Sequence, residues 1–144
     1  MMGIKLRLLK SALLCLMSSS VYAKEFKATE PLNLSENEMA YFVSFSIPEQ
    51  QIVTLIKAAE RRNIPIYLNG LVKNDMGATA KAILYLAQKY DIKGVLVDPV
   101  RFQHYGINAV PALVKKCGDK FDLVVGNVDI DYALELIRTE GDCK

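Results

Sequence analysis

Cysteine is the most reactive residue type in this chain, which contains three of them: Cys15, Cys117 and Cys143. A catalytic dithiol needs an accessible thiol of low pKa beside a resolving partner. Cys117 lies in a predicted turn and Cys143 near the end of the chain, and no motif connects them. Cys15 lies in the predicted signal peptide described below, so Cys117 and Cys143 are the two cysteines expected after cleavage. An even pair in an oxidising compartment is expected to form a structural disulfide. Two free thiols, or a bond to a partner, are the alternatives.

The other candidates for chemistry are isolated side chains. His104 is the single histidine, and no spacing of Cys, His, Asp or Glu matches a metal site. A surface or packing role is expected for it rather than general-base catalysis, and neither a metal nor another cofactor is expected. Asp98 ends a predicted strand, a place where functional groups gather in α/β folds. Asp98-Pro99 is also a common start of a turn, and that interpretation is favoured.

The first 23 residues have the layout of a secretory signal peptide. Lys5, Arg7 and Lys10 form a basic start, residues 13–17 form a short apolar run, and Ala23 marks the expected cleavage position. The run is far shorter than the ~20 residues that a membrane span needs, so no stable span is expected; an uncleaved anchor is the alternative. Export would place the cysteines in an oxidising compartment, where disulfides persist.

Composition limits the classes of partner. Hydrophobic residues make up 51% of the 144 residues, which suits one domain with a well-buried core. Cleavage after Ala23 would leave 15 basic and 16 acidic residues, a net charge of −1. Basic residues cluster only at Arg61-Arg62 and Lys115-Lys116. Nucleic acid and anionic membranes are therefore poor candidates as partners.

The predicted elements alternate between strand and helix. Strands are predicted at 40–45, 64–68, 95–97, 110–114 and 121–125, and helices between Ser46 and Arg62, between Asp75 and Asp91, and at 130–138. Alternation requires parallel strands, and the turn at 117–120 predicts an antiparallel hairpin. The predicted class is α/β, a mixed sheet flanked by helices. Residues 24–39 are expected to form a flexible lead-in and residues 40–144 the domain.

Local patterns predict how each helix begins and which face it buries. Ser46 and Glu49 have the spacing of a capping box around Pro48. Asp75 or Asn74 is expected to cap the second helix, and Asp129 or Asn127 the last. The positions predicted to face the core are Ile52, Leu55, Ile56 and Ala59 in the first helix, Ala80, Ile83, Leu84 and Ala87 in the second, and Ile130, Ala133, Leu134 and Ile137 in the last.

Residues 105–114, Tyr-Gly-Ile-Asn-Ala-Val-Pro-Ala-Leu-Val, resemble the thioredoxin-superfamily segment that leads into a strand headed by a cis-proline. The resemblance implies a thioredoxin-like fold in which Pro111 is cis and the nearby edge stays open to an extended peptide. An ordinary trans proline is the alternative. Ser46-Ile47-Pro48-Glu49 then stands where a thioredoxin has Cys-x-x-Cys. Because this segment contains no sulfur, redox catalysis of the thioredoxin kind is excluded.

Residues 97–114, taken together with residues 41–48, are similar to the TrbC family of F-type conjugative type IV secretion systems. The resemblance covers about residues 40–140. It implies a periplasmic protein required for assembly of the conjugative pilus, with a TraW-like protein as its partner, and hence an interaction module rather than an enzyme.

The expected contact surface is an open groove near the start of the first helix and the proline. Its candidate partner-binding residues are Ser46, Pro48, Phe102, Tyr105, Val110 and Pro111. Phe102 and Tyr105 are expected to be the anchors. The alternative function is a periplasmic thiol–disulfide oxidoreductase or chaperone that uses Cys117 and Cys143.

Overall fold

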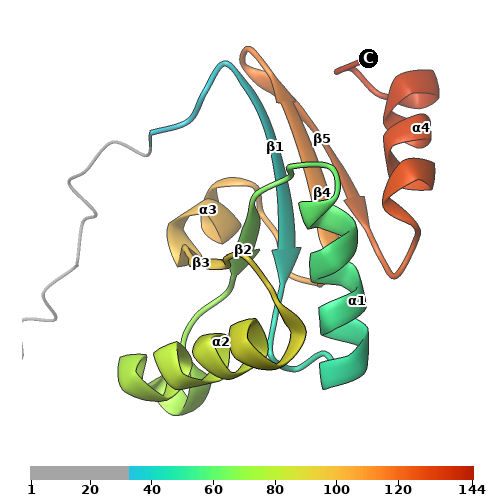
Figure 1. Cartoon of the computed structure of the whole chain (residues 1–144). Coiled ribbons are helices and arrows are strands. Elements are labelled where there is room, and N and C mark those ends of the chain that lie inside the picture. The colour runs from blue at the N-terminus through green and yellow to red at the C-terminus, as the bar shows by residue number, and fades with distance from the viewer. Residues whose placement is uncertain (1–32) are drawn as a thin grey trace, which may run out of the picture. The chain divides into compact units, whose positions relative to one another are not determined.

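A five-stranded mixed sheet runs through residues 33–144, the part of the chain that the computed structural model describes (Figure 1). Its strands are β1 (Asn37–Val43), β2 (Ile66–Leu68), β3 (Leu96–Val97), β4 (Ala112–Cys117) and β5 (Lys120–Val125). The strand order is β3-β2-β1-β4-β5. The predicted signal peptide, residues 1–23, lies outside the described residues, as do residues 24–32 of the predicted lead-in.

Strand directions confirm the predicted mixed sheet. β1, β2 and β3 are parallel, because a helix carries the chain back between them. β4 runs antiparallel to β1 and to β5, and the two-residue turn Gly118-Asp119 joins β4 to β5. β1 begins at Asn37, three residues before its predicted start. Asn37 to Met39 pair with Cys117 to Lys115, and this long-range pairing extends the strand.

Helices cover both faces of the sheet, as Figure 1 shows with α3 on the opposite side of β1 from α1 and α4. The helices are α1 (Glu49–Glu60), α2 (Met76–Tyr90), α3 (Pro99–His104) and α4 (Ile130–Glu140), with a short 3₁₀ turn at Val72–Asn74. α3 was not predicted. The Asp98 side chain accepts a hydrogen bond from the Arg101 amide and Pro99 occupies the first turn, so the predicted turn at Asp98-Pro99 is the start of a helix.

Alternate residues of β1 face two separate cores. Tyr41 and Val43 point into the first core, which is covered by α1, α2 and α4. Ala40 and Phe42 point into the second core, which is covered by α3. The second core is largely aromatic: the Phe42 ring centre lies 4.8 Å from that of Phe102 and 5.6 Å from that of Tyr67.

The predicted helix caps are partly confirmed. Asp75 caps α2 by accepting from the Ala78 amide, and Asp129 caps α4 by accepting from the Asp131 amide. The capping box of Ser46 and Glu49 is wrong. Pro48 is the N-cap residue of α1, and no side chain among residues 33–144 caps this helix. A capping box puts its acid three positions after the cap, whereas Glu49 is the first residue of the helix.

The predicted inward faces of α1 and α4 are confirmed, with Leu134 only half-buried. The predicted face of α2 is wrong at Ala80 and Leu84, which are exposed. α2 instead buries Leu86 and Thr79, whose hydroxyl donates to the Asp75 carbonyl and accepts from the Val72 amide. These two bonds remove the cost of burying a polar side chain. Apolar periodicity alone could not identify this face.

Candidate functional site

The loop between β1 and α1, residues 44–48, follows the carboxyl end of a central strand, a usual position for sites in α/β folds. Its side chains alternate between two cavities. Phe45 and Ile47 line one cavity, and Ser44 and Ser46 line the other. The candidate site is this loop together with the two cavities beside it.

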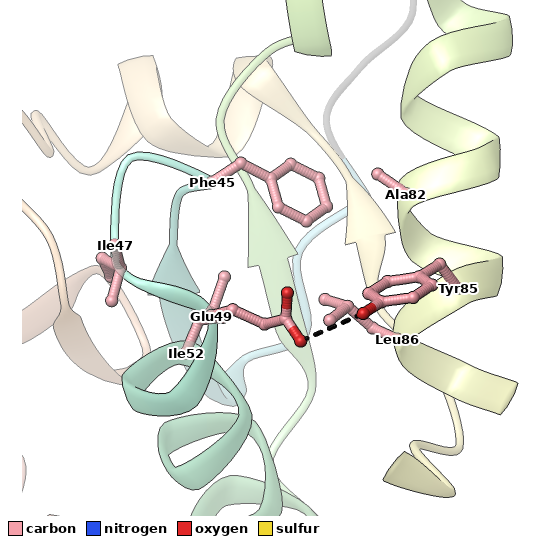
Figure 2. Close-up of a pocket in the computed structure, with 7 residues that line it drawn as sticks. All are labelled: Phe45, Ile47, Glu49, Ile52, Ala82, Tyr85 and Leu86. Carbon is pink, nitrogen blue, oxygen red and sulfur yellow. Dashed lines mark hydrogen bonds between the residues drawn. The ribbon is translucent and has the colours of Figure 1, made fainter. Parts of the chain in front are cut away.

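The first cavity, which we call the apolar cavity, has a volume of about 220 Å³ and lies between the start of α1 and α2 (Figure 2). It is lined by Phe45, Ile47, Glu49, Ile52, Ala82, Tyr85 and Leu86. Figure 2 shows the Phe45 ring and Ala82 on one side and the Glu49 carboxylate with the Tyr85 hydroxyl on another. An apolar space with a few polar groups is the usual form of a site that receives one apolar group.

Glu49 is held by α2 and does not cap its own helix. Its carboxylate accepts from Lys89 Nζ at 2.9 Å, from the Tyr85 hydroxyl at 3.3 Å and from the Tyr90 hydroxyl. Lys89 Nζ lies 5.0 Å from the centre of each tyrosine ring. The bonds from Lys89 and Tyr90 lower the pKa of Glu49, and the bond to Glu49 raises the pKa of Lys89. Both are charged at neutral pH, so Glu49 has no proton to give as a general acid.

The second cavity, which we call the polar cavity, has a volume of about 190 Å³ and joins the loop to the cis-proline segment. It is lined by Ser44, Ser46, Asn69, Phe102, Ile107, Asn108, Ala109 and Val110. The Val110–Pro111 bond is cis, as the resemblance implied. The fold therefore brings three of the predicted partner-binding residues, Ser46, Phe102 and Val110, to one place.

The predicted anchors are wrong as surface residues. Phe102 is 3% exposed and Tyr105 is 2% exposed, because α3 folds both side chains against Phe42 in the second core. Phe102 contributes to the lining of the polar cavity only as a buried residue. Pro111 is also buried, whereas Pro48 is exposed and lies outside both sets of lining residues.

A half-buried network at the margin of the second core is not predicted from the sequence. Arg101 donates to Glu38 at 3.1 Å and to Asp98 at 2.7 Å, and the Tyr105 hydroxyl donates to Glu38 at 3.1 Å. Burial and the charge of Glu38 raise the pKa of Tyr105. The Asp98-to-Arg101 spacing was a usable signal for the local pair, but the contact with Glu38 joins segments distant in sequence. The network positions α3 and leaves no free charged group for chemistry.

Cys117 and Cys143 form the predicted disulfide, with their Cα atoms 5.5 Å apart. The sheet register places Cys117 beside Asn37, the first residue of β1, whereas the candidate site follows Val43, the last. The bridge therefore lies at the opposite end of the sheet from the loop. His104 is exposed and packs edge-on against Tyr105. Within residues 33–144, no three His, Cys, Asp or Glu side chains are grouped so as to hold a metal ion.

Residues 41–137 match the model of a family described as "Type-F conjugative transfer system pilin assembly protein". The chain is similar to the periplasmic protein TrbC of Escherichia coli (strain K12), with 42% identity over 104 residues. The matched region is 72% of this chain and 49% of that protein, so the chain spans about half the length of this relative. A solved structure of MTB dsbF in its mixed oxidized and reduced forms aligns with a TM-score of 0.48 and 18% identity, over 73% of this chain and 81% of that chain.

Proposed function

Because the chain belongs to the family of type-F conjugative transfer system pilin assembly proteins, we propose that it assists assembly of the F-type pilus in the periplasm by binding other proteins. The observation that carries this proposal is the loop at the start of α1. It presents Ser46-Ile47-Pro48-Glu49 between two cavities and contains no thiol. The site can hold a group but has no residue placed to exchange electrons with it.

The chemistry of the loop argues against thiol–disulfide exchange. A reactive cysteine at a helix start depends on positive potential to lower the pKa of its thiol. Glu49 carries a negative charge at this position and keeps it because Lys89 and Tyr90 lower its pKa. The two cysteines among residues 33–144 are bonded to each other at the far end of β1 and β4.

The apolar cavity is the proposed anchor point for the partner, which we take to be a TraW-like protein. Its wall residues Phe45, Ile52 and Leu86 come from the loop, from α1 and from α2, so the space is shaped by the folded core. An apolar side chain of the partner would be removed from water there. The polar cavity, with Ser46 and Asn69 in its lining, would receive polar groups of the same segment.

A periplasmic location rests on the relative and on the predicted signal peptide. Within the described part of the chain, none of the helices has both the length and the apolar character needed to cross a bilayer.

Filling the apolar cavity with a large side chain tests the proposal. The substitution Ala82→Trp puts an indole ring into the apolar cavity, whereas Ala80→Trp puts the same ring on the exposed side of the same helix. Each variant replaces the native gene in a donor strain, and plasmid transfer, pilus number and co-purification with the TraW-like protein are measured. We expect Ala82→Trp to reduce all three and Ala80→Trp to behave as the native protein. Equal behaviour of two folded variants would contradict the site assignment.

The redox alternative is tested separately. The native protein and a Cys117→Ser/Cys143→Ser variant are assayed for reduction of a disulfide substrate with dithiothreitol as the electron source. We expect no turnover above background from either protein. Activity that disappears with the two cysteines would overturn the proposal in favour of an oxidoreductase.

A further inference from the structure

β5 is an edge strand whose outer backbone groups can be assigned. Within residues 33–144 it pairs only with β4. The Gly126 amide donates to the Pro111 carbonyl, and in an antiparallel ladder the bonded pairs alternate. Asp122 and Val124 therefore direct their N–H and C=O groups toward β4. Phe121, Leu123 and Val125 direct theirs away from the sheet.

This edge strand lacks the features that usually prevent an edge strand from pairing with another chain. The register from Lys120 to Val125 is continuous, so there is no bulge, and the strand contains no proline. Its one lysine is at the end, at Lys120. The Asp122 side chain is occupied, because it accepts from the backbone amides of Asp142 and Cys143. Phe121 and Val125 are 39% and 46% exposed. Exposed apolar side chains beside unpaired backbone groups favour pairing with another strand.

We propose that β5 pairs antiparallel with β5 of a second copy of this chain, across a two-fold axis at Leu123, and joins the two sheets into one. This inference goes beyond the proposed function and does not depend on either cavity. In this register Leu123 of one copy lies opposite Leu123 of the other. Phe121 of each copy lies opposite Val125 of the other, on both sides of the axis. Each of these pairs brings outward N–H and C=O groups together and exchanges two hydrogen bonds.

The side chains support a second copy as the occupant. A two-fold interface requires a self-complementary surface. Centred on Leu123, the strand places an aromatic ring opposite a β-branched side chain, a favourable cross-strand pair. Asp122 faces Val124 and Lys120 faces Gly126, so no two like charges are opposed. A one-residue shift would set outward groups against inward ones and lose the hydrogen bonds.

The space beside the edge also fits an added strand. A groove of about 370 Å³ lies between β5 and α4 and is lined by residues 122–125 together with Leu136, Ile137, Glu140 and Gly141. Tyr132 is one helical turn before Leu136, hence on the same side of α4, and is exposed. On that face the added strand would present Val124 of the second copy beside the groove, because Asp122 of each copy is held by its own Asp142 and Cys143 amides.

Charge substitutions at one cross-strand pair test the register. Sedimentation equilibrium on the mature protein purified from periplasm is expected to show a monomer–dimer equilibrium. Val125→Glu and Phe121→Lys, made singly, should each weaken the dimer at least about tenfold, the effect of 1.4 kcal/mol. The double variant should restore much of the loss, because each lysine then faces a glutamate of the other copy. Circular dichroism confirms that each variant is folded.

Cross-linking gives an independent readout. Leu123→Cys should form a disulfide-linked dimer under mild oxidation, because residue 123 of one copy lies opposite residue 123 of the other. Asp119→Cys, exposed in the turn of the same hairpin, should not. Three results would overturn the proposal: a native chain that stays monomeric up to its highest soluble concentration, a dimer that Val125→Glu leaves unchanged, or equal cross-linking at positions 119 and 123.

Discussion

Arg101 and Glu38 form an ion pair at the margin of the second core, with Arg101 Nε 3.1 Å from Glu38 Oε1. The two side chains are only 15% and 9% exposed. The same guanidinium donates to Asp98 and lies 4.8 Å from the Tyr67 ring centre. α3 has only six residues, and a helix of that length depends on tertiary contacts. The ion pair is one of the contacts that tie α3 to β1.

Arg101→Met should therefore destabilise the fold by about 3 kcal/mol, because it leaves the Glu38 carboxylate shielded from water without its cation. Urea unfolding followed by circular dichroism measures the change. Arg138→Met is the matched control, since Arg138 pairs with Glu135 on the exposed side of α4, where water screens the pair and its loss should change the stability very little. Adding Glu38→Gln to Arg101→Met should recover part of the loss. Equal effects at positions 101 and 138 would contradict this account.

Two buried tyrosines should respond in opposite directions to loss of the hydroxyl. The Tyr41 hydroxyl is buried and has no hydrogen-bond partner among residues 33–144, whereas the Tyr105 hydroxyl donates to Glu38. Tyr41→Phe should raise the free energy of unfolding by about 1 kcal/mol, because it removes a desolvated polar group. Tyr105→Phe should lower it by about 1–2 kcal/mol. The same urea titration measures both, and a destabilised Tyr41→Phe protein would show that this hydroxyl is satisfied in solution.

Tyr41 should also contribute to alkaline unfolding. Burial, and to a lesser extent the charge of Asp129, raise the pKa of Tyr41 from its ordinary value of 10.0 to about 12. A raised pKa in the folded state gives stability that is fully present below pH 10 and is lost as the pH rises toward 12. Tyr41→Phe should therefore flatten the fall in unfolding free energy above about pH 10. Unfolding curves at intervals across that range test this, and an unchanged slope would count against it.

The parts of the fold that follow from local pattern were predictable. Strands bounded by turn residues, caps such as Asp75 and the hairpin at Gly118-Asp119 depend on neighbouring residues, and the structure confirms them. The disulfide and the cis bond before Pro111 are also confirmed. The disulfide was predicted by pairing the two cysteines. The cis bond was predicted from the family resemblance and not from a physical derivation.

The candidate site was harder to predict because distant contacts decide it. Glu49 has the spacing of a capping acid, but Lys89 and Tyr90, about forty residues away, hold its carboxylate. Phe102 and Tyr105 have the character of interface anchors, yet both are buried in the second core, and one of the contacts that tie α3 to β1 joins the distant residues Arg101 and Glu38. Ala82, which lines the apolar cavity, had no sequence signal, since alanine is common on every face of a helix.

The disulfide should stabilise the C-terminal end of the domain. It closes a separation of 26 residues and ties Cys143, which is 2% exposed and follows α4, to the end of β4. A Cys117→Ala/Cys143→Ala variant should lose about 3 kcal/mol of stability in the chain-entropy account. Urea unfolding measures this, and the native chain with reductant should match the variant.

Hydrogen exchange in the variant should rise more at the amides of α4 than at those of α2, because the lost bond restrains only the segment after β4. α2 is the internal control, since it packs on the first core at a distance in sequence from both cysteines. Equal exchange at the two helices, or a loss below about 1 kcal/mol, would mean that the bridge adds little to the packing of Ile130, Ala133 and Ile137. A variant that is destabilised but still supports plasmid transfer would assign the two sulfurs a structural role.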